Sequence, residues 1–325
     1  MRIYSLVRNN HESGMSVPAQ TSPSLKNWIL LITIGLIWGT SFMMMSVALR
    51  GFGPVSIAAS RVTLAAILLV SFALLSGKGL PPLRGPKAGW VWAAALCMGF
   101  FSNAFPFFLL SWGQQYVASG FAGVTMAAVP LLILPLAHFL VPGERLSWLK
   151  GVGFTLGFIG VLMLIGLNAF KSLGVDNEAT ARLACFGAAG CYAIGSIITR
   201  LCPPVSKIAL AAATMLMASL ISLPMALWLE GVPEAMPLVP TLSILVLGVF
   251  PTAVAQLILV VIVRESGPSF MSLVNYQVPI WSLIFGALIL GEHLPTQFFA
   301  ALALILFGMA LSQWKVLWGL FRPAA

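Results

Sequence analysis

The few polar side chains within the apolar parts of this sequence lie close to prolines. Asn103 precedes Pro106 by three residues, and Gln256 follows Pro251 by five. A proline inside a helix removes a backbone hydrogen bond and favours a kink, and amide groups beside the kink can bind a small polar ligand. The candidates for ligand binding near these prolines are Asn103, Gln256, Asn275 and Tyr276, with Pro106, Pro130, Pro251 and Pro279 as candidate hinges or gates.

A structural interpretation of these residues stays open beside the functional one. Asparagine and glutamine commonly form hydrogen bonds between neighbouring helices in membrane bundles. Proline is tolerated in membrane helices as a static kink whose freed backbone groups are satisfied by neighbours. At about 100° per residue, Asn275, Tyr276 and Gln277 cannot all face the same side of one helix.

Two aromatic residues, Trp38 and Tyr192, fall near the centres of apolar runs rather than near their ends. Tryptophan in membrane-spanning helices is enriched at the two membrane interfaces, so a tryptophan at mid-depth needs another explanation. We expect Trp38 and Tyr192 to stack on the ring of a ligand or to hold a gate shut. Plain packing between helices is the alternative.

Arg61 is the one basic residue well inside an apolar run. It is the seventh residue after Pro54. At a rise of about 1.5 Å per residue, it lies about 10 Å from that end of the run. No acidic residue occupies a comparable position. Either the guanidinium binds a ligand carboxylate through two parallel hydrogen bonds, or it reaches back to the nearer membrane surface or to helix-end carbonyls.

Acidic residues and cysteines show no arrangement typical of catalysis or of a metal site. Glu144 and Glu292 lie just before two apolar runs, and each is expected to cap the helix that follows, because exposed N–H groups at a helix start favour a carboxylate. The four cysteines lack CxxC spacing and lie within or beside apolar runs, as expected of small core residues. The sequence predicts no metal, no cofactor and no catalytic residue.

The elements that must position these side chains are membrane helices. Of the 325 residues, 60% are hydrophobic and only 8% are charged, whereas soluble proteins have about 25% charged residues. A membrane-spanning helix needs about 20 apolar residues, and the apolar segments are too long and continuous for a transmembrane β-barrel. We count ten runs: 27–48, 54–76, 88–111, 118–141, 147–167, 183–200, 207–229, 239–262, 268–290 and 296–317.

The basic residues predict the orientation of the chain. The net charge is +9, but no segment between the runs is long enough to form a nucleic-acid-binding module. With a cytoplasmic N-terminus, 13 of the 17 Lys and Arg residues fall on the cytoplasmic side and three on the other. This is the asymmetry of the positive-inside rule, and it predicts that both termini are cytoplasmic.

Short sequence matches recur in the same order along the two halves of the chain. GERL at 143–146 recurs as GEHL at 291–294, Phe105-Pro106 as Phe250-Pro251, Ser119-Gly120 as Ser266-Gly267, and Pro130 as Pro279. The offsets of 145–149 residues predict two five-helix halves, 27–167 and 183–318, after a disordered cytoplasmic tail at 1–26. Because five is odd, the second half enters the membrane inverted, as in many secondary transporters.

The chain resembles the EamA-type ten-helix exporters of the drug/metabolite transporter superfamily, and among them bacterial aromatic amino acid exporters. The resemblance covers residues 27–318 and rests on WGTSF at 38–42, Pro54 with Arg61, Pro130 with GER at 143–145, and Pro279 with GEH at 291–293. It implies a central cavity lined mainly by helices 1–4 and 6–9, with helices 5 and 10 peripheral. The second half departs from the first at Ala211, which aligns with Arg61.

These observations together predict a secondary transporter of the bacterial inner membrane that exports amino acids, including aromatic and other apolar ones, by alternating access. Proton-driven carriers commonly carry carboxylates within the membrane, so their absence here favours facilitated transport. Export of other small metabolites or drugs is the alternative, and a membrane enzyme acting on a lipid-linked substrate is a remote one. The partners expected are a small molecule and the lipid bilayer, with no nucleic acid. The sequence does not determine the oligomeric state, and a monomer is compatible with two halves in one chain.

Overall fold

The computed structural model describes residues 23–141, 147–166, 177–293, 295–314 and 317–318. Within these ranges the chain is helical and contains no strand. Most of the predicted tail, 1–26, lies outside the described residues, and residues 25 and 26 already belong to the first helix. Glu144 also lies outside them, so its predicted capping role stays a prediction.

Eight described helices are long and apolar enough to cross a membrane, and two more, Val274–Leu290 and Thr296–Ser312, are apolar but shorter. They follow the predicted runs closely. The helices up to residue 166 are α2 (Leu25–Ala48), α3 (Pro54–Leu75), α4 (Ala88–Gly99), η1 (Phe100–Ala104), α5 (Phe105–Gly113), α6 (Ser119–Thr125), η2 (Met126–Ala128), α7 (Val129–Leu140) and α8 (Trp148–Ile165). Those that follow are α9 (Asn177–Leu201), α10 (Lys207–Leu229), α11 (Leu238–Leu247), η4 (Gly248–Val254), α12 (Ala255–Glu265), α13 (Gly267–Met271), α14 (Val274–Leu290) and α15 (Thr296–Ser312).

Several helices begin at residues that are typical of helix starts. The side chain of Ser24 accepts a hydrogen bond from the amide of Asn27, and Ser147 and Ser206 play the same role for α8 and α10. Pro54 occupies the first turn of α3, where a missing N–H costs nothing because that donor has no partner within the helix.

Three of the four prolines predicted to be hinges or gates coincide with interruptions of regular α-helix. Pro106 follows the π-helix η1, Pro251 lies inside the π-helix η4, and Pro130 follows the 3-10 turn η2. A proline cannot donate to the carbonyl four residues earlier, so the chain around it shifts to wider or tighter hydrogen bonding. Pro279 lies within the continuous helix α14.

The predicted run at 268–290 is divided in the structure. A turn at 272–273 separates α13 from α14. The side chain of Asn275 donates to the backbone oxygen of Ser272 at 3.0 Å, so a side chain competes with the helix for this carbonyl. The break was missed because the flanking residues are apolar and keep the helical pattern.

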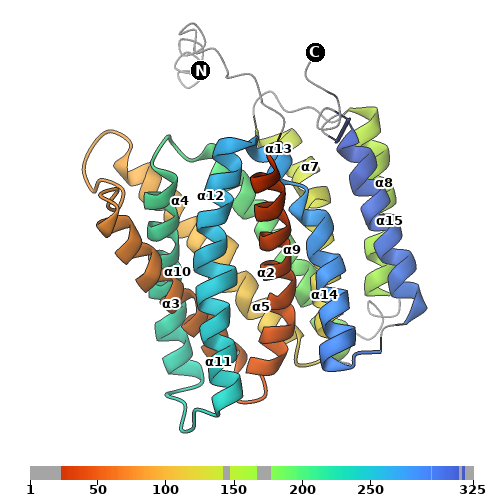
Figure 1. The fold of residues 1–325 in the computed structure, drawn as a ribbon, viewed down its shortest axis with the longest axis horizontal. Coiled ribbons are helices and arrows are strands. Elements are labelled where there is room, and N and C mark those ends of the chain that lie inside the picture. Colours follow the sequence, from red (N-terminus) through yellow and green to blue (C-terminus); the bar gives the residue numbers. More distant parts are fainter. Residues whose placement is uncertain (1–22, 142–146, 167–176, 294, 315–316, 319–325) are drawn as a thin grey trace, which may run out of the picture.

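The helices form a bundle in which α2 begins and α15 ends at the same end (Figure 1). Helices α8 and α15 lie together at one margin. A Cβ added at Gly153 would collide with the backbone oxygen of Gly308, and one added at Gly308 would collide with the backbone of α8. The two helices therefore approach to backbone contact, the packing that small residues allow in membranes.

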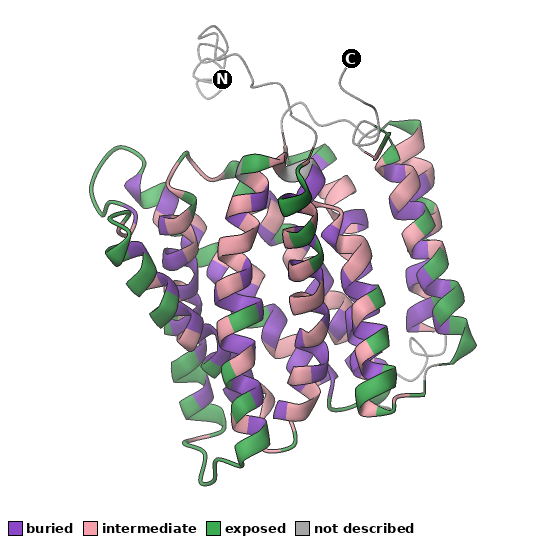
Figure 2. Cartoon of the chain, viewed as in Figure 1, coloured by how far each residue is buried: buried purple, intermediate pink, exposed green. Residues whose placement is uncertain are grey.

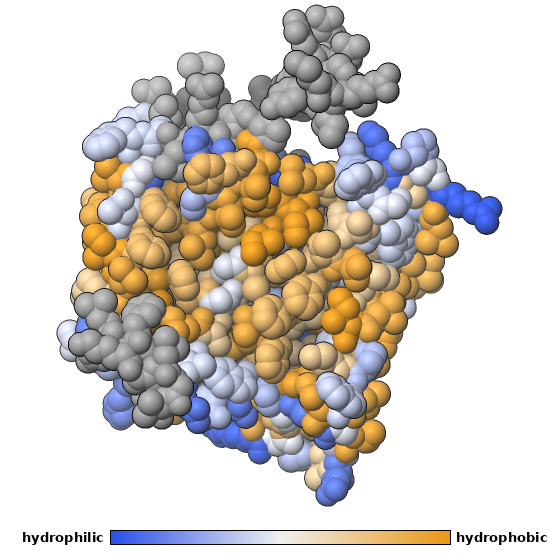
Figure 3. All heavy atoms as spheres, turned by 180° about the vertical axis from the view of Figure 1, so that it is seen from behind, coloured by the Kyte–Doolittle hydropathy of each residue, from blue (hydrophilic) through white to orange (hydrophobic). Residues whose placement is uncertain are grey.

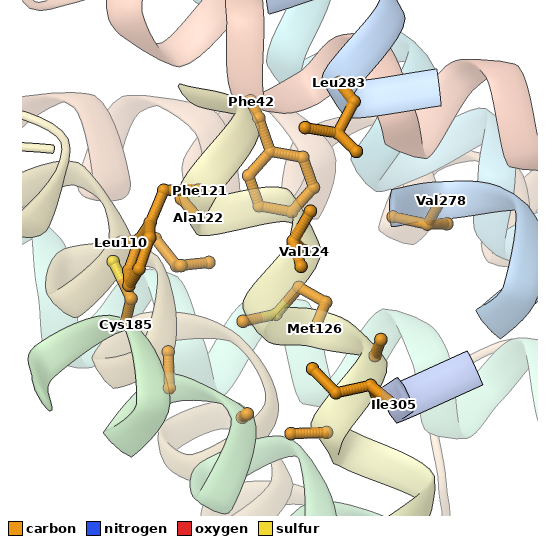
Figure 4. Packing of buried hydrophobic residues seen from close by; sticks show 14 of the residues in the cluster. Phe42, Leu110, Phe121, Ala122, Val124, Met126, Cys185, Val278, Leu283 and Ile305 are labelled. Atoms are coloured by element: carbon orange, nitrogen blue, oxygen red, sulfur yellow. The ribbon is translucent and has the colours of Figure 1, made fainter. Parts of the chain in front are cut away.

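Burial and hydropathy divide the bundle into an interior and a lipid-facing band. Buried residues face the inside of the bundle and exposed ones its outside (Figure 2), and an apolar band lies between hydrophilic margins (Figure 3). The largest buried cluster brings together α2, α6, α9 and α14, with Phe42 and Val124 next to Leu283, and Phe121 beside Leu110 and Cys185 (Figure 4). Large apolar side chains such as Trp90, Phe139 and Leu288 are exposed, as expected of a surface that contacts lipid.

Candidate functional site

A cavity of about 570 Å³ lies between the helices of the bundle. This volume falls in the range of small-molecule sites. Its walls come from α2, α3, α4, η1, α5, η2, α7, α9, α10, η4, α12 and α14, and helices α8 and α15 contribute no lining residue. The polar lining residues are Ser41, Arg61, Ser102, Asn103, Tyr192, Ser196, Thr199, Lys207, Thr214, Thr252, Gln256 and Asn275.

The cavity brings together most of the residues singled out from the sequence. Trp38, Asn103, Tyr192, Gln256 and Asn275 all line it, together with Arg61 and Pro251. Tyr276 does not line it: this residue packs against the main apolar cluster, and its hydroxyl is buried without a hydrogen-bond partner in the described structure. Pro106, Pro130 and Pro279 are not lining residues either.

Arg61 is buried in the cavity wall and does not reach a membrane surface. Only 3% of the residue is exposed. Its Nε donates to the Thr252 hydroxyl at 3.0 Å, and one terminal nitrogen lies 3.4 Å from the Ser41 hydroxyl. The guanidinium carbon stacks on the Phe107 ring at 3.6 Å from its centre. The expectation that Arg61 snorkels outward is therefore wrong, because neutral partners from α2, η4 and α5 hold it at the cavity.

None of the described contacts of Arg61 is a carboxylate. Burying an unpaired charge in a protein costs roughly several kcal/mol per ion, even after the surrounding structure has relaxed. Hydroxyls and an aromatic face recover only part of that cost. A guanidinium held this way beside a cavity is suited to bind an anionic group that enters the cavity.

The irregular backbone of η1 and η4 is stabilised by the side chains around the cavity. Trp38 donates from Nε1 to the backbone oxygen of Pro251 at 3.1 Å. Asn103 donates to the Met98 oxygen at 3.3 Å, and Thr252 to the Leu247 oxygen at 2.7 Å, each five residues earlier. A π-helix changes the hydrogen-bond geometry of the backbone carbonyls at and beside it, and these side chains donate hydrogen bonds to such carbonyls. Trp38 and Asn103 thus shape the wall while their remaining surface faces the cavity.

Several lining residues were missed by sequence reasoning, among them Phe107 and three residues with hydroxyl groups. The buried Thr214 hydroxyl lacks a hydrogen-bond partner in the described structure, and Ser41, Thr252 and Phe107 hold Arg61. Hydroxyl residues in apolar runs usually bond back to their own helix, so their types alone give little indication of a site. Ser41 lies in the WGTSF segment and Thr252 follows Pro251, and these neighbours were the available signals.

The cavity reaches one end of the bundle. The lining residues Thr199 and Lys207 lie where α9 ends and α10 begins, and both are exposed. We name this the Lys26 end, because Lys26 at the start of α2 bonds Glu265 at the end of α12 there, at 2.7 Å. Glu230 and Glu292 follow α10 and α14 at the opposite end, which we name the Glu230 end.

At the Glu230 end, two acidic residues bind the starts of helices that are distant in sequence. Glu230 accepts from the amides of Val55 and Ser56 at 2.9 and 2.8 Å. Glu292 accepts from the amides of Ser119 and Gly120 at 2.6 and 3.0 Å. Glu292 was expected to cap the helix that follows it. That expectation is wrong in the choice of helix: Glu292 caps α6, and Pro295 precedes α15.

The part of the chain that the structure describes contains no group of His, Cys, Asp or Glu that could hold a metal ion. Arg61 and Lys207 are the charged side chains among the lining residues, and none of the lining residues is acidic. The cavity wall therefore carries net positive charge and suits a small molecule with an anionic group and apolar or aromatic parts.

Comparison with known proteins agrees with this picture. The uncharacterized inner membrane transporter YedA of Escherichia coli K12 is 29% identical over 288 residues, which cover 86% of this chain and 88% of YedA. An uncharacterized transporter of Archaeoglobus fulgidus is 25% identical over 88% of this chain and 98% of its own length. The protein named "Probable terminal-alkyne amino-acid exporter" of Streptantibioticus cattleyicolor is 29% identical over 137 residues, 42% of this chain and 43% of that protein.

A solved crystal structure shares the fold with a TM-score of 0.64 and 22% sequence identity, covering 91% of this chain and 99% of the other. The model of the EamA-like transporter family matches residues 26–166 and 180–314. The two segments matched by the family model span most of the described helices and the whole cavity wall. The chain is a multi-pass membrane transporter and belongs to the EamA-like transporter family.

Proposed function

We propose that this transporter exports amino acids, including aromatic and other apolar ones, across the bacterial cytoplasmic (inner) membrane. Transport is facilitated and proceeds by alternating access, since none of the described lining residues is a carboxylate that could carry a proton. The chain acts as two inverted five-helix halves, 27–167 and 183–318, with both termini cytoplasmic. The paired helix interruptions at η1 with Pro106 and at η4 with Pro251 support this architecture, because matching interruptions mark the substrate region of such transporters.

The observation that carries the proposal is Arg61, a buried cation at the cavity whose described partners are neutral. The substrate carboxylate binds its guanidinium through charge-assisted hydrogen bonds. The side-chain oxygens of Gln256 and Asn275 accept hydrogen bonds from the substrate ammonium. Trp38, Tyr192 and Phe107 supply the aromatic surface against which an apolar side chain packs.

Flux measurements with purified protein in liposomes test this proposal. We expect counterflow of phenylalanine, leucine or related amino acids above protein-free liposomes, and weaker flux for Asn275→Ala and Trp38→Ala. A pH gradient should drive no accumulation. Absence of flux across the twenty amino acids, with protein that unfolds cooperatively, would remove amino acids as the substrate class. Normal flux in both variants would contradict the assignment of the cavity wall.

A second candidate is supported by the charge of the cavity. Because Arg61 and Lys207 line it and no acidic residue does, a small organic acid without an amino group is also compatible. Phenyllactate and phenylalanine differ by a hydroxyl in place of the ammonium and form a matched pair. Preference for phenyllactate would favour export of other small metabolites over amino acids.

A further inference from the structure

We infer that Glu292 is the latch that holds the Glu230 end of the transporter closed. The inference rests on the proposed alternating access, in which an end that is closed in one state must open in another. The described cavity reaches the Lys26 end, so the Glu230 end is the one that must open for release on that side.

The closed end is formed by α6 and α14 packed tightly against α2. A Cβ added at Gly123 of α6 would collide with the Ser282 hydroxyl of α14. Phe42, Met126 and Val278 belong to the buried cluster between these helices and also line the cavity, and Figure 4 shows Phe42 and Val124 next to Leu283. Phe42, near the end of α2, and Met126, just after α6, lie toward the Glu230 end and form the floor of the cavity, whereas Val278 lies in the first turns of α14. A path to the Glu230 end therefore requires α6 and α14 to separate.

Glu292 joins these two helices at the outermost point of their contact. Its two carboxylate oxygens accept from Ser119 and Gly120 in the first turn of α6. That helix has no side-chain cap of its own, since Ala118 occupies the cap position. A carboxylate at a helix start is stabilised by the unpaired N–H groups and by the helix dipole.

The surroundings of Glu292 are built to accept its side chain. Gly286 lies one turn before the end of α14, and a Cβ at this position would overlap a carboxylate oxygen of Glu292. The amide of Glu292 itself donates to the Gly286 oxygen at 3.1 Å. Backbone and side chain are therefore both held in place, while the hydrogen bonds to α6 are the only ones described for the carboxylate.

The position of the latch distinguishes it from the matching contact of Glu230. Glu230 caps α3, and α3 packs against α10 also through Ala65, Leu69, Ala212 and Met215, far from the Glu230 end. Separating α3 from α10 would break contacts along both helices. At Glu292, release of one side chain removes both hydrogen bonds that the carboxylate makes to the start of α6.

The test is cysteine labelling in cells with a membrane-impermeant thiol reagent, in a background without the four native cysteines. Met126→Cys reports access to the cavity floor. The positive-inside prediction places the Glu230 end on the outer side, where the reagent is added. Labelling needs no substrate, so a failed transport assay would leave this result interpretable.

We expect Glu292→Gln to raise the labelling rate of Met126→Cys about tenfold. The amide oxygen can keep one hydrogen bond as a neutral one, and the other is lost because the amide nitrogen of Gln cannot accept from a backbone N–H. Glu234→Gln is the matched control, since Glu234 is an exposed acid at the same end, and it should change nothing. Labelling of Thr199→Cys from the cytoplasmic side should fall in the Glu292→Gln protein, as alternating access requires.

A second variant removes a donor instead of the acceptor. Ser119→Pro deletes the amide that makes the 2.6 Å bond. Proline is favoured at the first position of a helix, and the Ser119 hydroxyl has no described partner to lose. This variant should also raise labelling of Met126→Cys. If both variants label at the rate of the Glu234→Gln control, Glu292 is not a latch.

Discussion

Replacing Arg61 with glutamine separates a ligand-binding guanidinium from a structural one. In a structural ion pair, removing one partner leaves a buried charge and costs about 3–5 kcal/mol. Arg61 has hydroxyl and aromatic partners instead, with the closer hydroxyl at 3.0 Å. Their loss costs about 2 kcal/mol in total, and the relief of burying an unpaired charge offsets it. We expect the free energy of unfolding to change by less than about 1 kcal/mol.

The effect on substrate binding should be much larger than the effect on stability. Hydrogen bonds to a charged group contribute about 1.5–3 kcal/mol, and each 1.4 kcal/mol is about tenfold in the dissociation constant. Arg61→Gln should therefore weaken phenylalanine binding by about 10- to 100-fold. Arg61→Lys keeps the charge but loses the bidentate geometry. Its affinity for phenylalanine should therefore lie between those of the unchanged protein and Arg61→Gln.

The assay compares phenylalanine with phenylalaninamide, which lacks the carboxylate, as competitors of flux in liposomes. Arg61→Gln should raise the half-saturating concentration of phenylalanine and leave that of the amide nearly unchanged. Lys207→Gln, at the exposed end of the cavity, should have a smaller effect because water screens its charge. Equal loss for both ligands, or a drop in thermal stability that accounts for the loss of flux, would refute the carboxylate assignment.

Three further predictions concern packing and hydrogen bonds. Gly308→Ala and Gly39→Ala should each lower the unfolding free energy in detergent by about 1–3 kcal/mol, since the added Cβ meets the backbone of α8 and the Trp281 Cβ. Gly190→Ala, with nothing within 4 Å, should not lower it, and equal effects at all three sites would contradict this packing. Trp38→Phe should cost about 1 kcal/mol through loss of the 3.1 Å bond to Pro251; an unchanged melting temperature would argue against that bond. Lys26→Ala should change stability by less than about 1 kcal/mol, because its partner Glu265 is exposed, and a larger loss would show that this pair matters for the Lys26 end.

Local patterns predicted where most of the described helices of this chain lie. An apolar run of about 20 residues forms a helix in a membrane because each backbone group must find its partner within the segment. Pro106, Pro130, Pro251 and Pro279 were predicted to interrupt helices for an equally local reason, since each lacks an N–H. The structure has irregular turns at the first three but not at Pro279, which lies within the continuous helix α14. The break before Asn275, where the Asn275 side chain bonds the Ser272 oxygen, escaped prediction because the apolar residues around it keep the helical pattern.

The partners of the polar residues depend on contacts between segments far apart in the chain. Arg61 bonds Thr252, 191 residues away, and Glu292 bonds Ser119, 173 residues away. Asn275 lines the cavity whereas its neighbour Tyr276 does not, because one step along a helix turns a side chain by about 100°. Helix formation is a short-range property of a segment in lipid, but the direction each helix faces is decided by packing against its neighbours. The sequence could therefore predict which polar residues lie within apolar helices, and only the assembled bundle showed which of them share a cavity.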